Sequence, residues 1–374
     1  MSKARAQARR RQKQGQRTVP ILWIWGIVIV LPLLLIVGVY YLFLNREGTA
    51  ATATGSLPSA TLAEEIETAV ATLEATAAAN FLAEPPDQQA LPSGPADYCR
   101  RHPRFARQLG FNERSILTTS APSVKGLVLI QPAEGNEPEQ VYQDPTWDDA
   151  GYLGHMTFDP VGNVYVFPAP RVSLIDNPPE QQNTLFRVDT DSAVLTPFIT
   201  LTAESPISAA NPYGLMGTTY DCDTNSLYAA TVAGSTSDVE NGKVVRIDLE
   251  TESVVAELQG IDPFGLTILN EAESTMADST AALIEKRLYF GAARSGEVYS
   301  IVLNAVGDFV GQPELELALP DPSLKPWRIV WDTNGDMVVR AMPFDYNLIA
   351  TSERIEVPFR FRQDAAGLWQ SVAE

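Results

Sequence analysis

The stretch NPYGLMGTTYDCDTNSLYAATVAGSTSDVENGKVVRIDLETESVVAELQG, residues 211–260, contains four short runs rich in Val, Leu, Tyr and Thr. Polar breaks rich in Asp, Asn, Gly and Ser separate these runs, which is typical of consecutive antiparallel strands. A four-stranded meander of this size cannot bury both faces by itself, so it needs neighbouring sheets of the same kind. The stretch therefore predicts one unit of a repeated all-β domain.

A strand, a tight polar turn and a second strand recur along the chain. The copies begin at Gly126, Thr184, Lys243, Glu297 and Phe359. Their starts are 58, 59, 54 and 62 residues apart. Four-stranded antiparallel units repeated radially make a β-propeller, which leaves few exposed sheet edges. We therefore expect residues 96–374 to form an all-β propeller of four-stranded blades.

Five blades are visible in this pattern, and a sixth is the alternative if a degenerate blade lies within residues 97–125. The first unit shows only one clear strand, RSILTTS at residues 114–120, before its strand-turn-strand copy. Its innermost strand is therefore expected either from residues 104–110 or not at all.

The chain before the domain has three distinct compositions. Residues 1–20 carry seven Lys or Arg and no acid, so the rest of a chain of net charge −19 carries −26. Residues 21–44 hold 24 residues without a charge, long enough to span a bilayer. The basic flank predicts a single-pass signal anchor with a cytoplasmic N-terminus and the propeller outside the cell membrane. A cleaved signal peptide is the alternative. Residues 45–95 read as an Ala/Thr/Pro-rich stalk with a short helix.

The composition and the motifs of the chain argue against several classes of function. A body of net charge −26 argues against nucleic-acid binding. The chain has only two histidines, and it has no HExxH, GxSxG, CxxC or phosphate-binding glycine loop. Asp221-x-Asp223-x-Asn225 and Asp332-x-Asn334-x-Asp336 have the spacing of calcium loops, but neither has Glu at the twelfth position. We therefore expect no metal and no cofactor, and assign no catalytic residue.

Two cysteines, Cys99 and Cys222, lie in the expected outside domain. In an oxidising compartment such a pair can form a disulfide, which would tie the start of the domain to its central repeat. Two unrelated buried thiols are the alternative.

Candidate binding residues come from the loops between the second and third strands of each unit. These loops are long at residues 168–183, 232–242 and 341–357, and we expect them to share one face of the propeller. Loops on a rigid scaffold commonly bind ligands, although long loops can also be tolerated without a function. The candidates on this face are Arg171, Asp176, Asp238, Asp345 and Tyr346.

Further candidates occupy the starts of inner strands. His155 and Arg328 hold equivalent repeat positions and could bind an anionic group at the mouth of the channel, or close the channel as a hydrogen-bonded pair. Tyr213, Phe264 and Trp327 each follow a proline and could stack on a ligand or pack between blades.

Three inner strands begin with related tetrads, Pro212–Leu215 (PYGL), Pro263–Leu266 (PFGL) and Pro326–Ile329 (PWRI). With the run DPVGNVYV at residues 159–166, these motifs resemble NHL-type and gluconolactonase-like propellers over most of residues 153–374. Such enzymes commonly have Asn or Asp between Pro and Gly to hold a divalent metal. Tyr213 and Phe264 stand there instead, so the resemblance implies the fold without that metal site.

The sequence thus predicts a membrane-anchored, extracytoplasmic β-propeller that binds a small molecule, a glycan or a protein. A lactonase-like hydrolase or a quinone-type oxidoreductase on the same fold is the alternative. A structural element of an envelope complex is a third.

Overall fold

The computed structural model describes residues 94–119, 125–135, 137–169, 175–208, 211–272, 284–347, 355–364 and 367–372. The chain divides into two compact units, residues 1–86 and 87–374, and all described residues belong to the second. The basic tail, the predicted transmembrane segment and all of the stalk except Gly94 and Pro95 lie outside the described residues. Within the described residues, no helix is long and apolar enough to cross a membrane.

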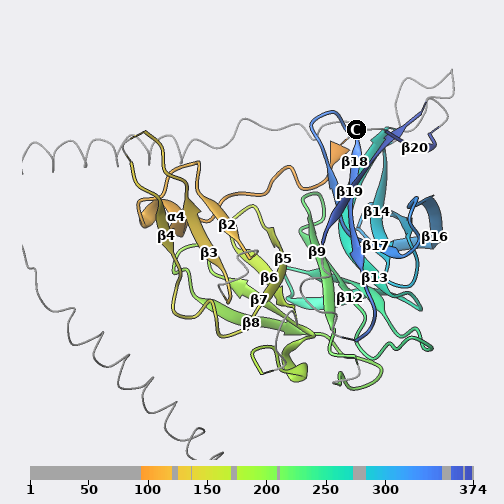
Figure 1. Cartoon of the computed structure of the whole chain (residues 1–374), viewed down its shortest axis with the longest axis horizontal. Coiled ribbons are helices and arrows are strands. Elements are labelled where there is room, and N and C mark those ends of the chain that lie inside the picture. The colour runs from red at the N-terminus through yellow and green to blue at the C-terminus, as the bar shows by residue number, and fades with distance from the viewer. Residues whose placement is uncertain are drawn as a thin grey trace, which may run out of the picture. The chain divides into compact units, whose positions relative to one another are not determined.

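Five antiparallel sheets follow one another along the chain as the blades of a propeller (Figure 1). Blade 1 has β2 (Ile116–Thr118), β3 (Val128–Gln131) and β4 (Gln140–Tyr142). Blade 2 has β5 (Leu153–Phe158), β6 (Val164–Pro168), β7 (Thr184–Val188) and β8 (Leu195–Thr200). Blade 3 has β9 (Leu215–Asp221), β10 (Ser226–Thr231), β11 (Lys243–Asp248) and β12 (Ser253–Gln259).

Blade 4 has β13 (Pro263–Ala272), β14 (Ile284–Ala292), β15 (Glu297–Leu303) and β16 (Phe309–Ala318). Blade 5 has β17 (Leu324–Trp331), β18 (Met337–Pro343), β19 (Val357–Gln363) and β20 (Trp369–Ser371). The short β1 (Gly94–Pro95) pairs with β13, the helix α4 (Arg104–Gln108) precedes blade 1, and the 3-10 turn η1 (Pro179–Gln181) precedes β7. The predicted all-β, five-bladed propeller is confirmed.

The described residues decide two points that the sequence left open. Blade 1 has three strands rather than four. Residues 104–110, which the sequence offered as a source of its innermost strand, begin with α4 instead. The sixth blade, which was the alternative to five, is likewise not formed by the described part of residues 97–125. Phe105 and Ala106 of α4 are buried beside Trp147, so this segment forms a helix that contributes its apolar side chains to the core.

The blades pack face to face, and each successive pair encloses an apolar core. Trp147 is buried between blades 1 and 2, Tyr220 between blades 2 and 3, Tyr228 between blades 3 and 4, and Tyr289 between blades 4 and 5. In the outer strand β12, half-buried residues alternate with exposed ones, which reflects one face that packs and one that meets solvent. The cores therefore explain the repeat seen in the sequence.

The first strands β5, β9, β13 and β17 lie side by side at the centre. Two glycines allow their backbones to approach closely. A Cβ atom on Gly265 would lie 2.5 Å from the Trp327 carbonyl oxygen, and one on Gly217 would lie 3.0 Å from the Gly265 Cα. Gly265 also has a positive φ of 35°. The second-to-last position of the PFGL tetrad thus needs glycine for packing.

A strap formed by residues 94–105 crosses the turns that join first and second strands (Figure 1). The strap pairs with β13 through β1, and its Ala96 carbonyl accepts a hydrogen bond from the Cys222 amide in blade 3. It then reaches blade 2, where Phe105 donates its amide to the Thr190 carbonyl over 2.8 Å. Cys99 and Cys222 form a disulfide, so of the two readings left open by the sequence the structure has the bonded one.

Candidate functional site

The loops between second and third strands meet on the face opposite the strap, together with the segments that connect one blade to the next. We call this the loop face. Lys125 of the β2–β3 loop contacts Asp176 of the β6–β7 loop. Asp262 lies in the connection between blades 3 and 4. Its carboxylate accepts hydrogen bonds from residues of three further loops between second and third strands, β10–β11, β14–β15 and β18–β19. The described parts of the loops at 168–183, 232–242 and 341–357 therefore belong to one face.

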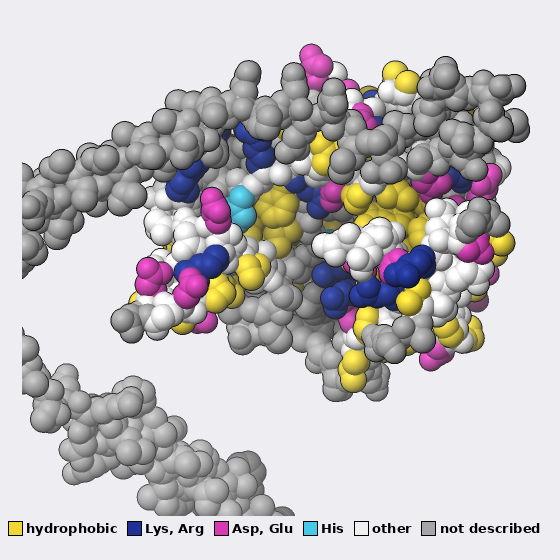
Figure 2. All heavy atoms as spheres, turned by 90° about the horizontal axis from the view of Figure 1, so that it is seen from above, with side chains coloured by type: hydrophobic (Ala, Val, Ile, Leu, Met, Phe, Trp, Pro, Cys, Tyr) yellow, Lys and Arg dark blue, Asp and Glu magenta, His cyan; other side chains and the backbone are white. Residues whose placement is uncertain are grey.

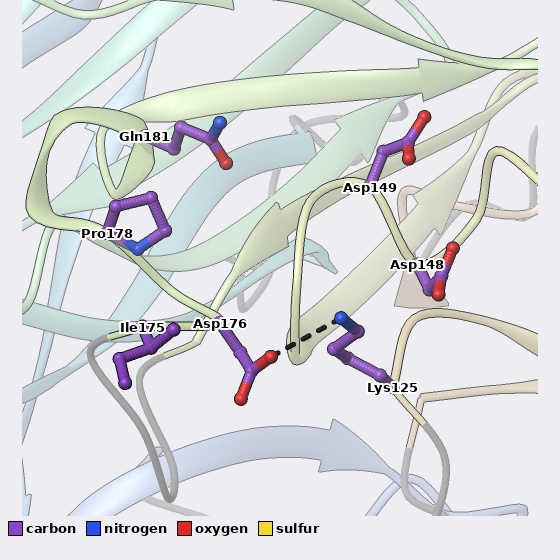
Figure 3. A pocket seen from close by; sticks show the side chains of 7 residues that line it. All are labelled: Lys125, Asp148, Asp149, Ile175, Asp176, Pro178 and Gln181. Atoms are coloured by element: carbon purple, nitrogen blue, oxygen red, sulfur yellow. Dashed lines mark hydrogen bonds and ion pairs between the residues drawn. The ribbon is translucent and has the colours of Figure 1, made fainter.

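A hollow of about 330 Å³ opens on this face between blades 1 and 2. Its lining is mostly polar and comes from three segments of chain (Figure 3). The lining residues are Lys125, Asp148, Asp149, Ile175, Asp176, Pro178 and Gln181. The Lys125 ammonium lies 3.3 Å from Asp176 Oδ1 and joins the two blades across the hollow.

The walls of the hollow are fixed by buried groups behind them. The fully buried Asn177 accepts a hydrogen bond from the Tyr152 amide and donates one to the Tyr152 carbonyl, both over 2.9 Å. A Cβ atom on Gly151 would lie 2.0 Å from the Asp176 carbonyl oxygen, so glycine lets the two segments touch. On the other wall, Trp147 donates to the Ala193 carbonyl over 2.6 Å and anchors the segment that carries Asp148 and Asp149.

The hollow presents acceptors and one cationic donor. Three carboxylates and one ammonium group line the hollow, and the Gln181 Oε1 atom is buried with no hydrogen-bond partner among the described residues. A buried amide oxygen without a partner is unfavourable, and a ligand that donates a hydrogen bond would relieve it.

Aromatic rings close the middle of the loop face. Tyr213, Phe264 and Trp327 are buried, and Phe344 from the β18–β19 loop packs between them. Its ring centroid lies 5.0 Å from that of Tyr213 and 4.5 Å from that of Phe264, both with edge-to-face geometry. The three rings predicted at strand starts are therefore buried in packing between blades, and Phe344 contacts those of Tyr213 and Phe264.

Asp262 ties the loops of blades 3, 4 and 5 together beside these rings. Its buried carboxylate accepts hydrogen bonds from Ser235, Gly242, Arg294 and the Tyr346 hydroxyl. Burial, and then the bond to Asp262, raises the pKa of Tyr346. Tyr346 is thus a structural partner in this network.

His155 and Arg328 form a pair where blades 2 and 5 approach each other. The Arg328 Nε–H donates to His155 Nε2 over 2.7 Å, and both side chains are half-buried. An imidazole nitrogen that accepts a hydrogen bond carries no proton, so in this geometry the neutral ring has its proton on Nδ1. The structure has the hydrogen-bonded pair that the sequence offered as one interpretation, and the binding of an anionic group stays a prediction.

The structure separates the remaining candidates. Asp176 lines the hollow, whereas the exposed Asp238 and Asp345 lie on the loops that Asp262 joins. Arg171 lies outside the described residues. Lys125, Asp148, Asp149, Gln181 and Asp262 were missed by the sequence reasoning. Asp148, Asp149 and Asp262 lie in segments that connect one blade to the next. A search of those segments for charged residues would have indicated them.

The two calcium-like motifs use their oxygens within the protein. Lys286 lies 2.8 Å from Asp221 and 2.6 Å from Asp223, and Arg362 binds both oxygens of Asp336. Among the described residues, no group of three or more His, Cys, Asp or Glu is placed to hold a metal ion.

Figure 2 shows charged side chains of both signs, with hydrophobic side chains visible in hollows between them. The sheets and their order define the class of this domain, a five-bladed β-propeller. No family model and no curated protein matches the chain.

Solved structures of similar architecture share little sequence with it. The β-propeller domain of the Trilobed protease from Pyrococcus furiosus is 8% identical with a TM-score of 0.31, over 69% of this chain and 66% of that chain. The chain thus spans just under two thirds of that propeller. An exo-1,5-α-L-arabinanase from a bovine ruminal metagenomic library is 10% identical with a TM-score of 0.33, over 70% of this chain and 96% of that chain. A polysaccharide lyase described as an ulvan lyase is 9% identical with a TM-score of 0.32, over 69% and 71%.

Likeness at this level concerns architecture alone. The finer resemblance to NHL-type and gluconolactonase-like propellers stays a prediction.

Proposed function

We propose that the domain is a binding module that holds a small polyhydroxylated ligand, such as a sugar unit, in the hollow between blades 1 and 2. The observation that carries this proposal is the convergence of three chain segments around one polar space of about 330 Å³. Sites of this kind combine a preformed shape with a few polar groups that orient the ligand.

The lining favours a ligand with many hydroxyl groups. A hydroxyl group both donates and accepts, so it can donate to Asp148, Asp149 or the Gln181 oxygen and accept from Lys125. The side chains of Ile175 and Pro178 add apolar surface at the rim, where the C–H face of a sugar ring can pack.

We also propose that the domain is displayed outside the membrane on its N-terminal anchor. The uncharged segment at residues 21–44 and the seven basic residues before it support this orientation. The Cys99–Cys222 disulfide is in keeping with an oxidising compartment.

A titration of the full-length chain with a panel of mono- and oligosaccharides tests the binding proposal. A ligand at 100 times its Kd should stabilise the domain by about 2.7 kcal/mol and raise its melting temperature. The Gln181→Met variant keeps the size of the side chain but removes the acceptor, and should weaken binding about five- to tenfold without a loss of stability.

Asp345→Asn, on the same face but away from the hollow, is the matched control and should bind like the wild type. The proposal would be overturned if no member of the panel binds, or if a sugar binds the wild type and Gln181→Met with equal affinity. No particular observation among the described residues favours the alternative hydrolase or oxidoreductase, so we do not propose a second function.

A further inference from the structure

The described lining of the hollow between blades 1 and 2 has more negative than positive charge. Asp148, Asp149 and Asp176 each contribute a carboxylate, and Lys125 contributes the one ammonium group (Figure 3). Three negative charges and one positive charge give these lining residues a formal charge of −2. The Lys125 ammonium lies 3.3 Å from Asp176 Oδ1, so Asp176 already has a cationic partner. The excess therefore belongs to Asp148 and Asp149.

The main chain of Asp148 and Asp149 is held in place, whereas their carboxylates have no partner. The Asp149 amide donates to the Thr146 carbonyl oxygen over 3.3 Å, and the Gly151 amide donates to the Asp148 carbonyl oxygen over 3.0 Å. Within the described residues, neither carboxylate takes part in a hydrogen bond or an ion pair. Asp148 is half-buried and Asp149 is exposed at the rim.

Turn formation does not account for these two acids. An Asp in a turn commonly accepts a hydrogen bond from a main-chain amide two residues further along the chain. Asp144, at the start of the same segment, does so over 2.9 Å from the Thr146 amide, and it also accepts a bond from the Thr146 hydroxyl. Asp148 and Asp149 accept no such bond among the described residues, so their acceptors are available to a ligand.

A neutral acceptor in the same hollow points to the same kind of ligand. The Gln181 Oε1 atom is buried and has no hydrogen-bond partner within the described residues. An amide oxygen and a carboxylate only accept, so all three groups need N–H or O–H donors from outside. The ammonium of Lys125 is already engaged by Asp176. The hollow therefore lacks donors and positive charge, and a complementary ligand supplies both.

We propose that the hollow binds amino sugars in preference to neutral or acidic sugars, with the protonated amino group of the ligand held by Asp148 and Asp149. An ammonium group brings three donors and a positive charge, and hydrogen bonds between charged groups are about twice as strong as neutral ones. A uronic acid or a sulfated sugar would instead add a negative charge to a site that is already negative.

This inference rests on the proposed sugar-binding function and narrows the class of ligand. The size of the hollow limits the ligand further. Its volume of about 330 Å³ lies at the lower end of the range for ligand sites, about 300–1,000 Å³, so we expect one or two sugar rings.

Calorimetric titration of the full-length chain in mild detergent tests the preference. The probes are matched monosaccharides and disaccharides with gluco, galacto and manno rings, each with an amino, an N-acetylamino or a hydroxyl group at carbon 2. At about pH 6 the free amino group is protonated. The amino form of the sugar that binds best should bind at least about tenfold more tightly than its N-acetylated and hydroxyl counterparts. Raising the salt concentration from about 50 to about 300 mM should reduce this preference.

Two variants locate the preference within the hollow. Asp148→Asn and Asp149→Asn keep the size of the side chain and remove its charge. Each should weaken binding of the amino sugar about five- to tenfold, and should change binding of the hydroxyl counterpart by less than about twofold. Asp345→Asn removes the same charge from the loop face away from the hollow, so it controls for the negative charge of the whole domain and should bind like the wild type.

The outcomes separate this inference from the function on which it rests. Equal affinity for an amino sugar and its hydroxyl counterpart would refute the preference and leave sugar binding in place. The assignment to Asp148 and Asp149 would be wrong if their variants kept the preference, or if Asp345→Asn reduced it as much. If no sugar of any set binds, the proposed function and this inference both fail.

Discussion

Arg328 in β17 donates a hydrogen bond to His155 in β5 over 2.7 Å, although 173 residues separate them along the chain. The pair bridges the first strands of blades 5 and 2 beside the incomplete blade 1. Removing it with Arg328→Met, which keeps the apolar part of the side chain, should lower the free energy of unfolding by about 0.5–1.5 kcal/mol.

A double-mutant cycle with His155→Phe measures the coupling between the two residues by urea denaturation. Arg340→Met is the control, because Arg340 pairs with Arg328 in the β17–β18 register but its side chain is 47% exposed. It should change stability by less than about 0.5 kcal/mol. A coupling energy of zero would show that the pair does not hold the two strands together.

The buried Asp262 carboxylate should be the most sensitive polar position of the loop face. Asp262→Ala leaves Arg294 and the Tyr346 hydroxyl without their shared acceptor, and should cost about 3–5 kcal/mol of unfolding free energy. The exposed Asp238→Asn, in a loop that Asp262 holds, should be nearly neutral. Limited proteolysis should then cut the β10–β11 loop faster in Asp262→Ala than in the control, and equal rates would contradict the network.

Replacing Gly265 by a residue with a side chain should lower the stability of the domain for two reasons, which can be measured separately. Gly265 and Gly311 both have positive φ values, 35° and 80°, but a Cβ atom at Gly311 would meet no atom within 4 Å. Gly311→Ala should therefore show only the backbone term, about 1–2 kcal/mol. Gly265→Ala adds the overlap with the Trp327 carbonyl and should cost about 1–3 kcal/mol more in thermal or urea unfolding. Equal losses would mean that the central strands are less closely packed.

The pH dependence of stability should report on Glu271. Four carboxylates, those of Glu271, Glu285, Glu314 and Glu316, surround the single guanidinium of Arg287. Burial raises the pKa of Glu271 above its ordinary value, against the opposing effect of the Tyr289 hydrogen bond and Arg287. The folded state thus holds this proton more tightly than the unfolded state, and the resulting stability is present in acid and lost as pH rises through the folded pKa.

Glu271→Gln mimics the protonated group, so it should raise the melting temperature at pH 7.5 and have a smaller effect at pH 4. Glu314→Gln, whose side chain is 64% exposed, is the control and should show a weaker dependence on pH. A gain that is equal at both pH values would exclude the ionisation of Glu271 as its cause.

Much of the fold could be predicted because each blade repeats a local pattern. Apolar alternation and turn residues specify a strand and its break within a few positions, so the meander at residues 211–260 was recognisable without tertiary information. The three-stranded form of blade 1 was harder to predict, because a helix and a strand can bury the same apolar side chains, here those of Phe105 and Ala106 in α4. In the structure this segment forms α4, and Phe105 packs on Trp147.

For the candidate site, the sequence could predict only the face of the propeller on which it lies. The long loops were visible in the sequence, but Lys125 and Asp148 come from segments that show no repeat, and their meeting with Asp176 depends on how blade 1 packs on blade 2. Tyr213, Phe264 and Trp327 illustrate the opposite case, in which residues suited to stacking a ligand are buried in packing between blades.

The sequence by itself determined the strand-turn-strand repeat and hence the propeller, because periodicity and turn chemistry act over a few residues. Tertiary structure alone decided that Cys99 reaches Cys222, that Arg328 reaches His155, and that three segments enclose the hollow. Each of these depends on contacts between residues far apart in the chain, and their positions follow from the packing of whole blades rather than from local preference.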